Sequence, residues 1–289
     1  MVVPISRRSF VAGLSTFPFA AQAFAQEPAS NPFHLTGTPR QGAALLGRLP
    51  DELLADDVMM LMLSDLRIDF AHDGRFIIAF DRDAGPEAVL RADTRQDVII
   101  EQKLIVAQGQ WQIENVDAPL LGGAASSEEF QQRRTAELEQ IVAARAVRTD
   151  GDGWRQSFIW PIKARISGHF GAQRIFRGTP ASYHNGVDLA GGAGATYVAP
   201  ADGVVVLAVD RPFTLEGNLL IVDHGMGLNS AFLHSQKLLV KQGDVVKQRQ
   251  PLGLIGATGR ASGPHLHWAM KWDAARIDPV TLVESQGAL

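Results

Sequence analysis

The chain has 289 residues, a mass of 31.2 kDa and 46% apolar residues, which fits one or two globular domains and excludes a disordered or fibrous chain. Its 27 basic and 31 acidic residues give a net charge of −4, so the basic excess that nucleic-acid binding requires is missing and no nucleic-acid partner is expected. Cysteine is absent, which excludes disulfides, thiolate metal sites and a cysteine nucleophile and leaves His, Asp and Glu as metal ligands.

Residues 1–25 are predicted to be an export signal. The pair Arg7 and Arg8 precedes an apolar run over 11–25 that is too short to span ~30 Å of hydrocarbon, and 23–25 have the small-x-small pattern of a signal-peptidase site. Two arginines followed by Ser-Phe-Val resemble a twin-arginine signal, which implies export of a folded protein to the bacterial periplasm. No later stretch reaches 18 consecutive apolar residues, so no membrane span is expected after cleavage.

A small all-β module is predicted over residues 26–125. Its first part, up to residue 50, is rich in Pro, Gly, Thr and Asn and is expected to be an extended lead-in. After that, short apolar runs alternate with turn signals, and residues 72–75 and 107–110 are typical of hairpin turns. The module holds no catalytic constellation, so a spacer, a binding module and a cover for an active site all remain open. The expected strands are 58–63, 76–80, 98–107 and 111–116.

Residues 126–157 are expected to contain one amphipathic helix and a linker. Ser126 and Glu129 have the Ser-x-x-Glu spacing of a capping box. Apolar residues then recur near helical spacing with charges between them, which predicts a helix over roughly 127–147. The polar, turn-prone run at 148–153 indicates a boundary between domains.

An antiparallel β-sheet domain is predicted for residues 158–289. Nineteen of the 28 glycines lie between 151 and 289, so turns are dense there, and no helix-length segment supplies the crossovers of an α/β fold. The fold class is therefore mainly β: a small N-terminal all-β module, one connecting amphipathic helix and a C-terminal antiparallel sheet. The expected strands of this domain are 204–209, 219–222, 228–233, 252–255 and 266–270.

Six of the eight histidines fall between residues 169 and 267, which is the strongest chemical signal in the chain. His184 and Asp188 are four residues apart, and Gly186 between them favours a loop or strand edge where a bend brings both to one ion. His265 and His267 share one face if they lie on a strand. Two adjacent imidazoles repel when protonated and are costly when buried unpaired, whereas a metal ion resolves both problems. The alternatives are an exposed histidine pair and a surface His beside a solvated Asp.

Together these motifs supply two His and one Asp, and three such ligands with a water are the pattern of catalytic zinc, although other divalent metals accept the same donors. With these blocks in place, residues 158–283 resemble the lysostaphin-type zinc endopeptidases, which cut the peptides of peptidoglycan. The resemblance rests on four blocks in order: His184-x-Gly186-x-Asp188, Ala199-Pro200-x-Asp202-Gly203-Val204-Val205, Phe232-x-His234 and Gly263-Pro264-His265-Leu266-His267-Trp268.

The resemblance implies a β-sheet catalytic domain with a groove, and one Zn²⁺ per chain held by His184, Asp188 and His267. It implies that His234 and His265 are catalytic without binding the metal, and it leaves open which of them is the general base. The implied reaction is hydrolysis of peptide cross-links of peptidoglycan by a metal-activated water, with stem peptides as the partner. This chain has Phe232 at a position where the family commonly has Tyr. The difference either removes a hydroxyl from the site or means that this residue only packs against its neighbours.

Two other functions compete with this one. A catalytically silent wall-binding protein or activator of other wall hydrolases would share the fold. A swinging-arm carrier domain would need a lysine at a hairpin tip, and Lys237, Lys241 and Lys247 do not stand in such a turn. Of the remaining histidines, His224 is expected to orient a turn or a neighbouring side chain, and His169 to lie in a loop at the groove.

Overall fold

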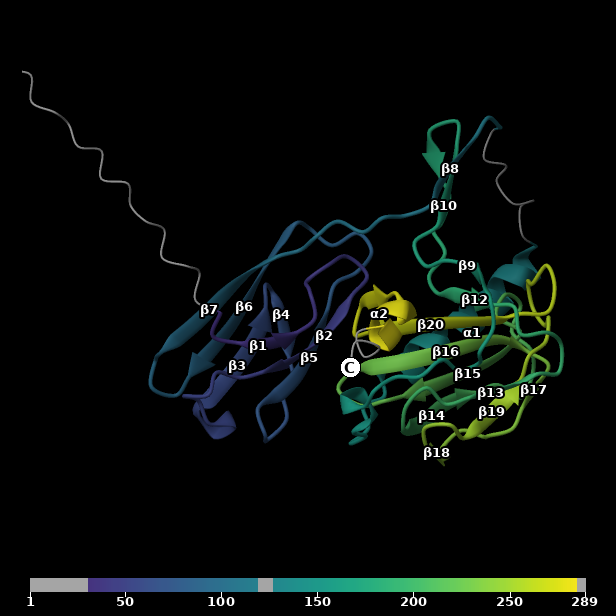
Figure 1. Cartoon of the computed structure of the whole chain (residues 1–289). Coiled ribbons are helices and arrows are strands. Elements are labelled where there is room, and N and C mark those ends of the chain that lie inside the picture. The colour runs from purple at the N-terminus through teal and green to yellow at the C-terminus, as the bar shows by residue number, and fades with distance from the viewer. Residues whose placement is uncertain (1–30, 119–126, 285–289) are drawn as a thin grey trace, which may run out of the picture. The chain divides into compact units, whose positions relative to one another are not determined.

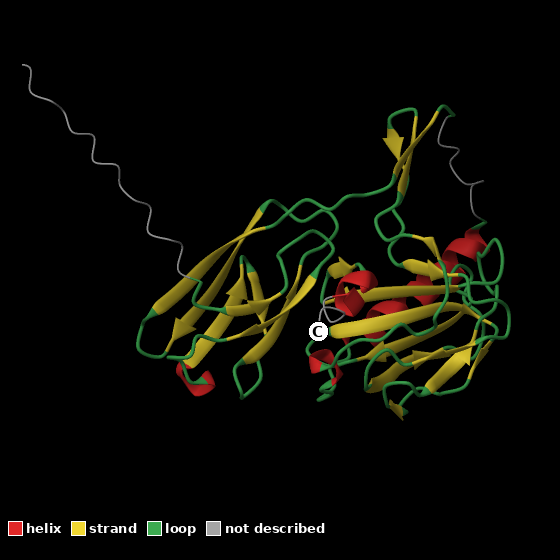
Figure 2. Ribbon diagram, in the orientation of Figure 1, coloured by secondary structure: helices red, strands yellow, loops and turns green. Residues whose placement is uncertain are grey.

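In the computed structural model, residues 31–118 and 127–284 are described, and the predicted export signal lies outside them. The fold is mainly β, as the sequence predicts (Figures 1 and 2). No helix in the described part of the chain is long and apolar enough to cross a membrane. The domain boundaries expected near residues 125 and 157 stay predictions.

Two antiparallel sheets lie within residues 34–105. The Gly74 turn, with φ +77°, lies where a hairpin turn is predicted. Gly47 leaves room for its cross-strand partner Phe76, whose ring would lie 2.2 Å from a Cβ at position 47. The predicted lead-in instead contains two strands. One sheet has the order β1 (His34–Thr36), β2 (Ala44–Arg48), β5 (Arg75–Ala79), and the other β4 (Leu66–Ile68), β3 (Val58–Leu63), β6 (Glu87–Thr94), β7 (Ile99–Ile105); a 3-10 turn, Ala55–Asp57, precedes β3.

The strand β8 (Ile113–Val116) contradicts the hairpin predicted at residues 107–110. That hairpin would pair β8 with β7, whereas β8 pairs in parallel with β10 (Gln173–Phe176), which also pairs with β11 (Thr179–Pro180). Three of the four β8 residues are exposed, so no apolar face ties the strand to the N-terminal sheets. Because a short exposed strand does not encode its partner in its pattern, sequence proximity gave the wrong neighbour.

The helix α1 (Glu128–Ala146) occupies the predicted position. Its N-cap is Ser127, whose hydroxyl accepts from the Phe130 amide at 3.2 Å. The cap therefore lies one residue later than the predicted box, and Phe130 stands where the reciprocal Glu would be needed. Ala144 packs with Ile221 and Ala231 on one face of the large sheet.

The large antiparallel sheet follows the order β18-β14-β15-β16-β20-β12-β9, with β21 on β20 (Figure 1). One face packs into the core through the cross-strand row Leu220, Phe232, Trp268 and Val187, all fully buried. A smaller sheet has the order β13-β19-β17. The bounds are β9 Ile166–Gly168, β12 Val187–Leu189, β13 Thr196–Val198, β14 Gly203–Ala208, β15 Asn218–Asp223, β16 Leu228–Ser235, β17 Lys237–Leu238, β18 Val245–Val246, β19 Pro251–Leu254, β20 Leu266–Trp272 and β21 Ala275–Ile277, with a 3-10 turn Gly153–Arg155 and the final helix α2 Pro279–Glu284.

Candidate metal centre

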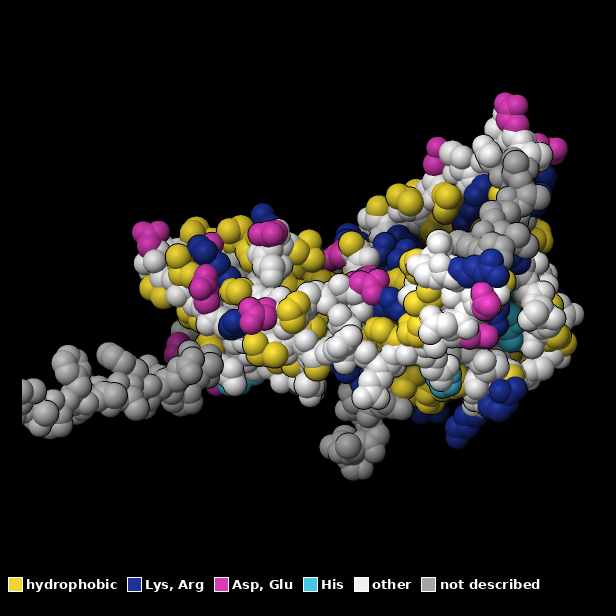
Figure 3. Space-filling view, turned by 90° about the horizontal axis from the view of Figure 1, so that it is seen from above, with side chains coloured by type: hydrophobic (Ala, Val, Ile, Leu, Met, Phe, Trp, Pro, Cys, Tyr) yellow, Lys and Arg dark blue, Asp and Glu magenta, His cyan; other side chains and the backbone are white. Residues whose placement is uncertain are grey.

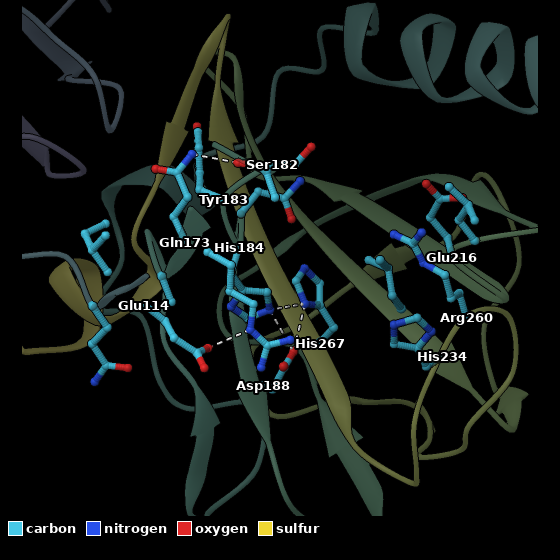
Figure 4. Close-up of a pocket in the computed structure, with 18 residues that line it drawn as sticks. Glu114, Gln173, Ser182, Tyr183, His184, Asp188, Glu216, His234, Arg260 and His267 are labelled. Carbon is cyan, nitrogen blue, oxygen red and sulfur yellow. Dashed lines mark hydrogen bonds and ion pairs between the residues drawn. The ribbon is translucent and has the colours of Figure 1, made fainter. Parts of the chain in front are cut away.

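Three of the side chains singled out from the sequence converge on the large sheet (Figure 4). Asp188 in β12 and His267 in β20 are cross-strand partners, and His184 comes from the loop before β12. His184 Nε2 lies 3.1 Å from both Asp188 Oδ1 and His267 Nδ1, and the last two atoms are 2.9 Å apart. Two nitrogens and one carboxylate oxygen thus form a nearly equilateral triangle.

Two glycines permit this approach. A Cβ at Gly186 would lie 2.6 Å from the Trp268 carbonyl oxygen and 2.7 Å from His267 Nε2. A Cβ at Gly168 would lie 2.4 Å from Asp188 Oδ2. Gly186 is therefore needed because its backbone passes directly over the β20 strand and leaves no space for a side chain. The position does not require an unusual φ.

The donor set fits a divalent metal ion. The His184 Nδ1 atom lies 2.9 Å from the His169 carbonyl oxygen, so it donates there and leaves the Nε2 lone pair facing the triangle. The triangle's sides are close to the ~3.3 Å that separates ligands around a tetrahedral ion with bonds of ~2.05 Å. Burial lowers the pKa of His267, which favours the neutral, ligating form. Burial alone would raise the pKa of Asp188, but hydrogen bonds to His184 and His267 hold it below its usual range.

His234 and His265 lie beside the triangle. Their ring centroids are 4.9 Å apart, and His265 Nε2 is 3.6 Å from Asp188 Oδ1. His234 Nδ1 donates to the Thr258 carbonyl and His265 Nδ1 to the Gly263 carbonyl, each at 2.8 Å. Each ring is thereby held in the tautomer whose Nε2 carries no proton and can accept one.

His234 reaches the site through a break in strand alternation. Phe232, two residues earlier on β16, is fully buried on the opposite face and stacks on Tyr197 with centroids 5.3 Å apart. Strict alternation would send His234 into the same core. Its φ of +65°, beside a register shift between β15 and β16, turns the ring toward His265 instead. Phe232 is accordingly a packing residue. The hydroxyl of a Tyr at this position would face the core.

A cavity of about 830 Å³ opens over the triangle. Residues of β8 and β10 line one side of it, and there the exposed Glu114 pairs with Arg174. On another side Glu216 is held by Arg134 of α1 through two hydrogen bonds of 2.6 and 2.7 Å. The Arg260 side chain lies in the cavity near His234 (Figure 4).

A cation from the N-terminal half supports the segment that carries His184. Arg82 Nε donates to the Gly171 carbonyl at 3.2 Å, and Arg82 Nη2 donates to Gln173 Oε1 at 3.0 Å. Its guanidinium lies 4.6 Å from the centre of the Tyr183 ring, in cation–π contact. Sequence reasoning missed Arg82, because nothing in its local pattern distinguishes it from a solvated surface arginine.

The other histidines play different parts. His224 is fully buried away from the triangle, as expected of a residue that orients its neighbours. His169 contributes its backbone carbonyl to the His184 hydrogen bond.

Comparison with known proteins places a family match over this site. The model described as Peptidase family M23 matches residues 182–279. Peptidoglycan DD-endopeptidase ShyA of Vibrio cholerae serotype O1 is 38% identical over 125 residues, which is 42% of this chain and 29% of that protein. Murein hydrolase activator NlpD of Escherichia coli (strain K12) is 31% identical over 127 residues, 44% of this chain and 30% of that protein. The chain thus spans less than a third of the length of either relative.

The fold itself has a solved counterpart. A crystal structure described as a peptidase M23 of Pseudomonas aeruginosa matches with a TM-score of 0.66, covering 86% of this chain and 97% of that chain at 24% identity. This likeness extends the shared architecture beyond the matched segment, as a likeness of fold.

Proposed function

Residues 182–279 form a domain of Peptidase family M23, and from that premise we propose that the chain is a zinc-dependent endopeptidase that hydrolyses peptide cross-links of bacterial peptidoglycan. The observation that carries the proposal is the convergence of His184, Asp188 and His267 next to two histidines whose Nδ1 atoms donate to backbone carbonyls. Similarity to the DD-endopeptidase ShyA supports peptidoglycan as the substrate. The predicted export signal supports action in the periplasm.

The residues divide the work as follows. His184, Asp188 and His267 would hold the zinc ion, which when bound lowers the pKa of a coordinated water from ~15.7 to about 7 and polarises the scissile carbonyl. His234 and His265 offer Nε2 as the site that takes the proton of the attacking water. The protonated ring then donates to the carbonyl oxygen as it becomes negative, or to the leaving amine. Burial lowers the pKa of His234, which keeps that ring neutral and able to accept a proton.

The test is digestion of purified peptidoglycan with the mature chain, with zinc, with a chelator, and with the chelator followed by zinc. Mass analysis of the released muropeptides identifies the bond. We expect cleavage that chelation abolishes and zinc restores, and a loss of at least about 1000-fold in His267→Ala because a ligand is removed. His72→Ala, at an exposed histidine of the N-terminal half, is the matched control and should retain full activity. Cleavage that survives both chelation and His267→Ala would defeat the proposal.

A second function is favoured by one comparison, the match to the activator NlpD. In that case the chain would stimulate another wall hydrolase and cut nothing itself. The full set of converging side chains argues for catalysis, since an activator does not need them. Metal analysis separates the two: a purified chain without stoichiometric metal that still stimulates a partner hydrolase supports activation.

A further inference from the structure

The sheet face that carries the triangle continues along β20 as a second cavity of about 330 Å³. Because side chains alternate along a strand, His267, Ala269 and Lys271 lie on the same face of β20. At ~3.3 Å per residue, Lys271 lies about 13 Å from His267 along this line. This cavity, here called the trough, shares Asn185, Glu216, Leu233 and His267 with the cavity over the triangle. The cross-strand partners on β16 of the three β20 residues are Leu233, Ala231 and Asn229.

Small residues and an apolar wall shape the trough. Its floor includes Ala269, which carries only a methyl group, and the cross-strand partner Ala231 is buried in the cluster that contains Ala144 of α1. Helix α1 provides the wall through Leu138 and Val142, whose side chains are 44% and 66% exposed. These dimensions suit an extended peptide of about four residues, whose small side chains would contact the apolar wall.

The far end of the trough is cationic. Lys271, its cross-strand partner Arg276 on β21 and Arg145 of α1 all line the cavity. Arg145 donates to Asn229 Oδ1 at 2.7 Å and Arg276 to the Tyr183 hydroxyl at 3.1 Å. None of the three cations lies within 4.0 Å of a carboxylate of residues 31–118 or 127–284.

Two of the neighbouring acids pair with other arginines, and a third contacts the backbone of Arg276. Asp273 pairs with Arg148, Glu216 with Arg134, and Asp81 accepts the backbone N–H of Arg276 at 2.8 Å. Burial, followed by the charges of Arg145 and Arg276, lowers the pKa of Lys271, and the carboxylates of Asp81 and Asp273 offset this only in part. Lys and Arg side chains also gather in several groups on the part of the surface that holds the large sheet (Figure 3).

We propose that Lys271, Arg276 and Arg145 form a subsite for a carboxylate of the peptide substrate, about 13 Å from the bond that is cut. The inference rests on the proposed function and adds a preference for acidic peptides that lie extended from the metal centre to Lys271. A guanidinium or ammonium that lacks a carboxylate within the protein gains most from an anion supplied by the ligand.

The experiment compares cross-linked muropeptides whose stem-peptide carboxylates are free with the same molecules amidated. For the wild type we expect kcat/KM for the free acids to exceed that for the amides about tenfold or more, with a preference that falls as NaCl rises. In Lys271→Gln the ratio should fall to within about twofold, and Lys271→Arg should restore it. Lys237→Gln on β17 removes the same charge at an exposed site outside the trough and should keep the wild-type ratio. A wild-type ratio in Lys271→Gln, or an equal loss in Lys237→Gln, overturns the subsite.

Equilibrium binding of the same muropeptides to the chelated chain separates the two proposals. Tighter binding of the free acids that depends on Lys271, with no cleavage after zinc is added, supports the subsite and contradicts the proposed function. Cleavage of free and amidated forms at equal rates supports the proposed function and overturns the subsite. Equal binding without any cleavage overturns both.

Discussion

His224 is fully buried in a chain of hydrogen bonds between neutral groups. Its Nδ1 lies 2.7 Å from the Asp202 carbonyl oxygen and its Nε2 lies 2.8 Å from Ser230 Oγ, which also accepts from Trp268 Nε1 at 3.2 Å. Burial lowers the pKa of His224 to about 4. The folded state therefore contains the neutral His224 ring. If Nε2 were protonated, it would have no hydrogen-bond acceptor unless the Ser230 hydroxyl rotated.

This burial predicts a pH-dependent stability. The unfolded chain binds a proton at His224 near pH 6.5, whereas the folded chain binds it only near pH 4. The stabilisation that comes from the neutral His224 ring is therefore fully present above pH 6.5 and is lost as the pH falls toward 4. We expect the unfolding free energy of the wild type to lose up to about 3 kcal/mol more than that of His224→Gln across this window. Denaturant unfolding of both proteins at pH 7.5, 6 and 4.5 measures the difference. Parallel curves for the two proteins would refute the assignment.

The residues of the site differ in how far the sequence could predict them. The spacing of His265 and His267 and the Gly between His184 and Asp188 indicate proximity directly, and the structure brings the three candidate ligands together. The orientation of His234 depends on a positive φ and a register shift, which arise from pairing with β15 and leave no local sign. The catalytic roles given to His234 and His265 stay predictions.

At the scale of the elements, α1 is fastened to the domain through a buried carboxylate. Glu137 Oε1 accepts from both the amide and the hydroxyl of Thr214 at 2.7 Å, while Oε2 accepts from Arg134 at 3.1 Å. Its side chain is only 6% exposed. Heptad-like spacing would assign this position to solvent, so the sequence predicted the helix and its limits but not the polar contact that holds it.

Glu137→Ala should therefore destabilise the protein by about 1–3 kcal/mol, because it leaves the Thr214 amide and hydroxyl partly buried without their acceptor, while Arg134 keeps Glu216. Glu137→Gln keeps an acceptor oxygen and should cost less. Glu129→Ala, at an exposed position of the first turn, is the matched control on the same helix. Chemical denaturation measures all three. A loss for Glu137→Ala no larger than for Glu129→Ala would show that the contact contributes little.

At the scale of the whole molecule, the N-terminal half is connected to the metal centre through the segment that precedes His184. Arg82 bonds to Gly171 and Gln173, and the Gly171 amide in turn donates to the His184 carbonyl at 2.8 Å. Arg82 is 7% exposed. Sequence analysis predicted two halves of mainly β structure, but contacts between residues 89 positions apart follow from tertiary packing that no local pattern records.

Arg82→Ala should weaken metal binding about tenfold, since outer-shell partners that orient a ligand commonly contribute 10–100-fold. Competition with a chromophoric chelator measures the zinc dissociation constant independently of activity. Arg75→Ala, an exposed arginine of β5, serves as the control, and circular dichroism checks that each variant is folded. An affinity within twofold of wild type for Arg82→Ala would show that the segment is held without it.

The parallel pairing of β8 with β10 separates two properties of the cavity. Residues 112–114 supply one wall, while the candidate ligands stand on β12, on β20 and in the loop between β11 and β12. Substitutions or insertions near residue 113 therefore alter the width of the entrance without touching any donor atom. Mutations in this wall can change which molecules enter the cavity while the metal-binding side chains stay the same. The substrate selectivity and the chemical reaction can therefore evolve independently.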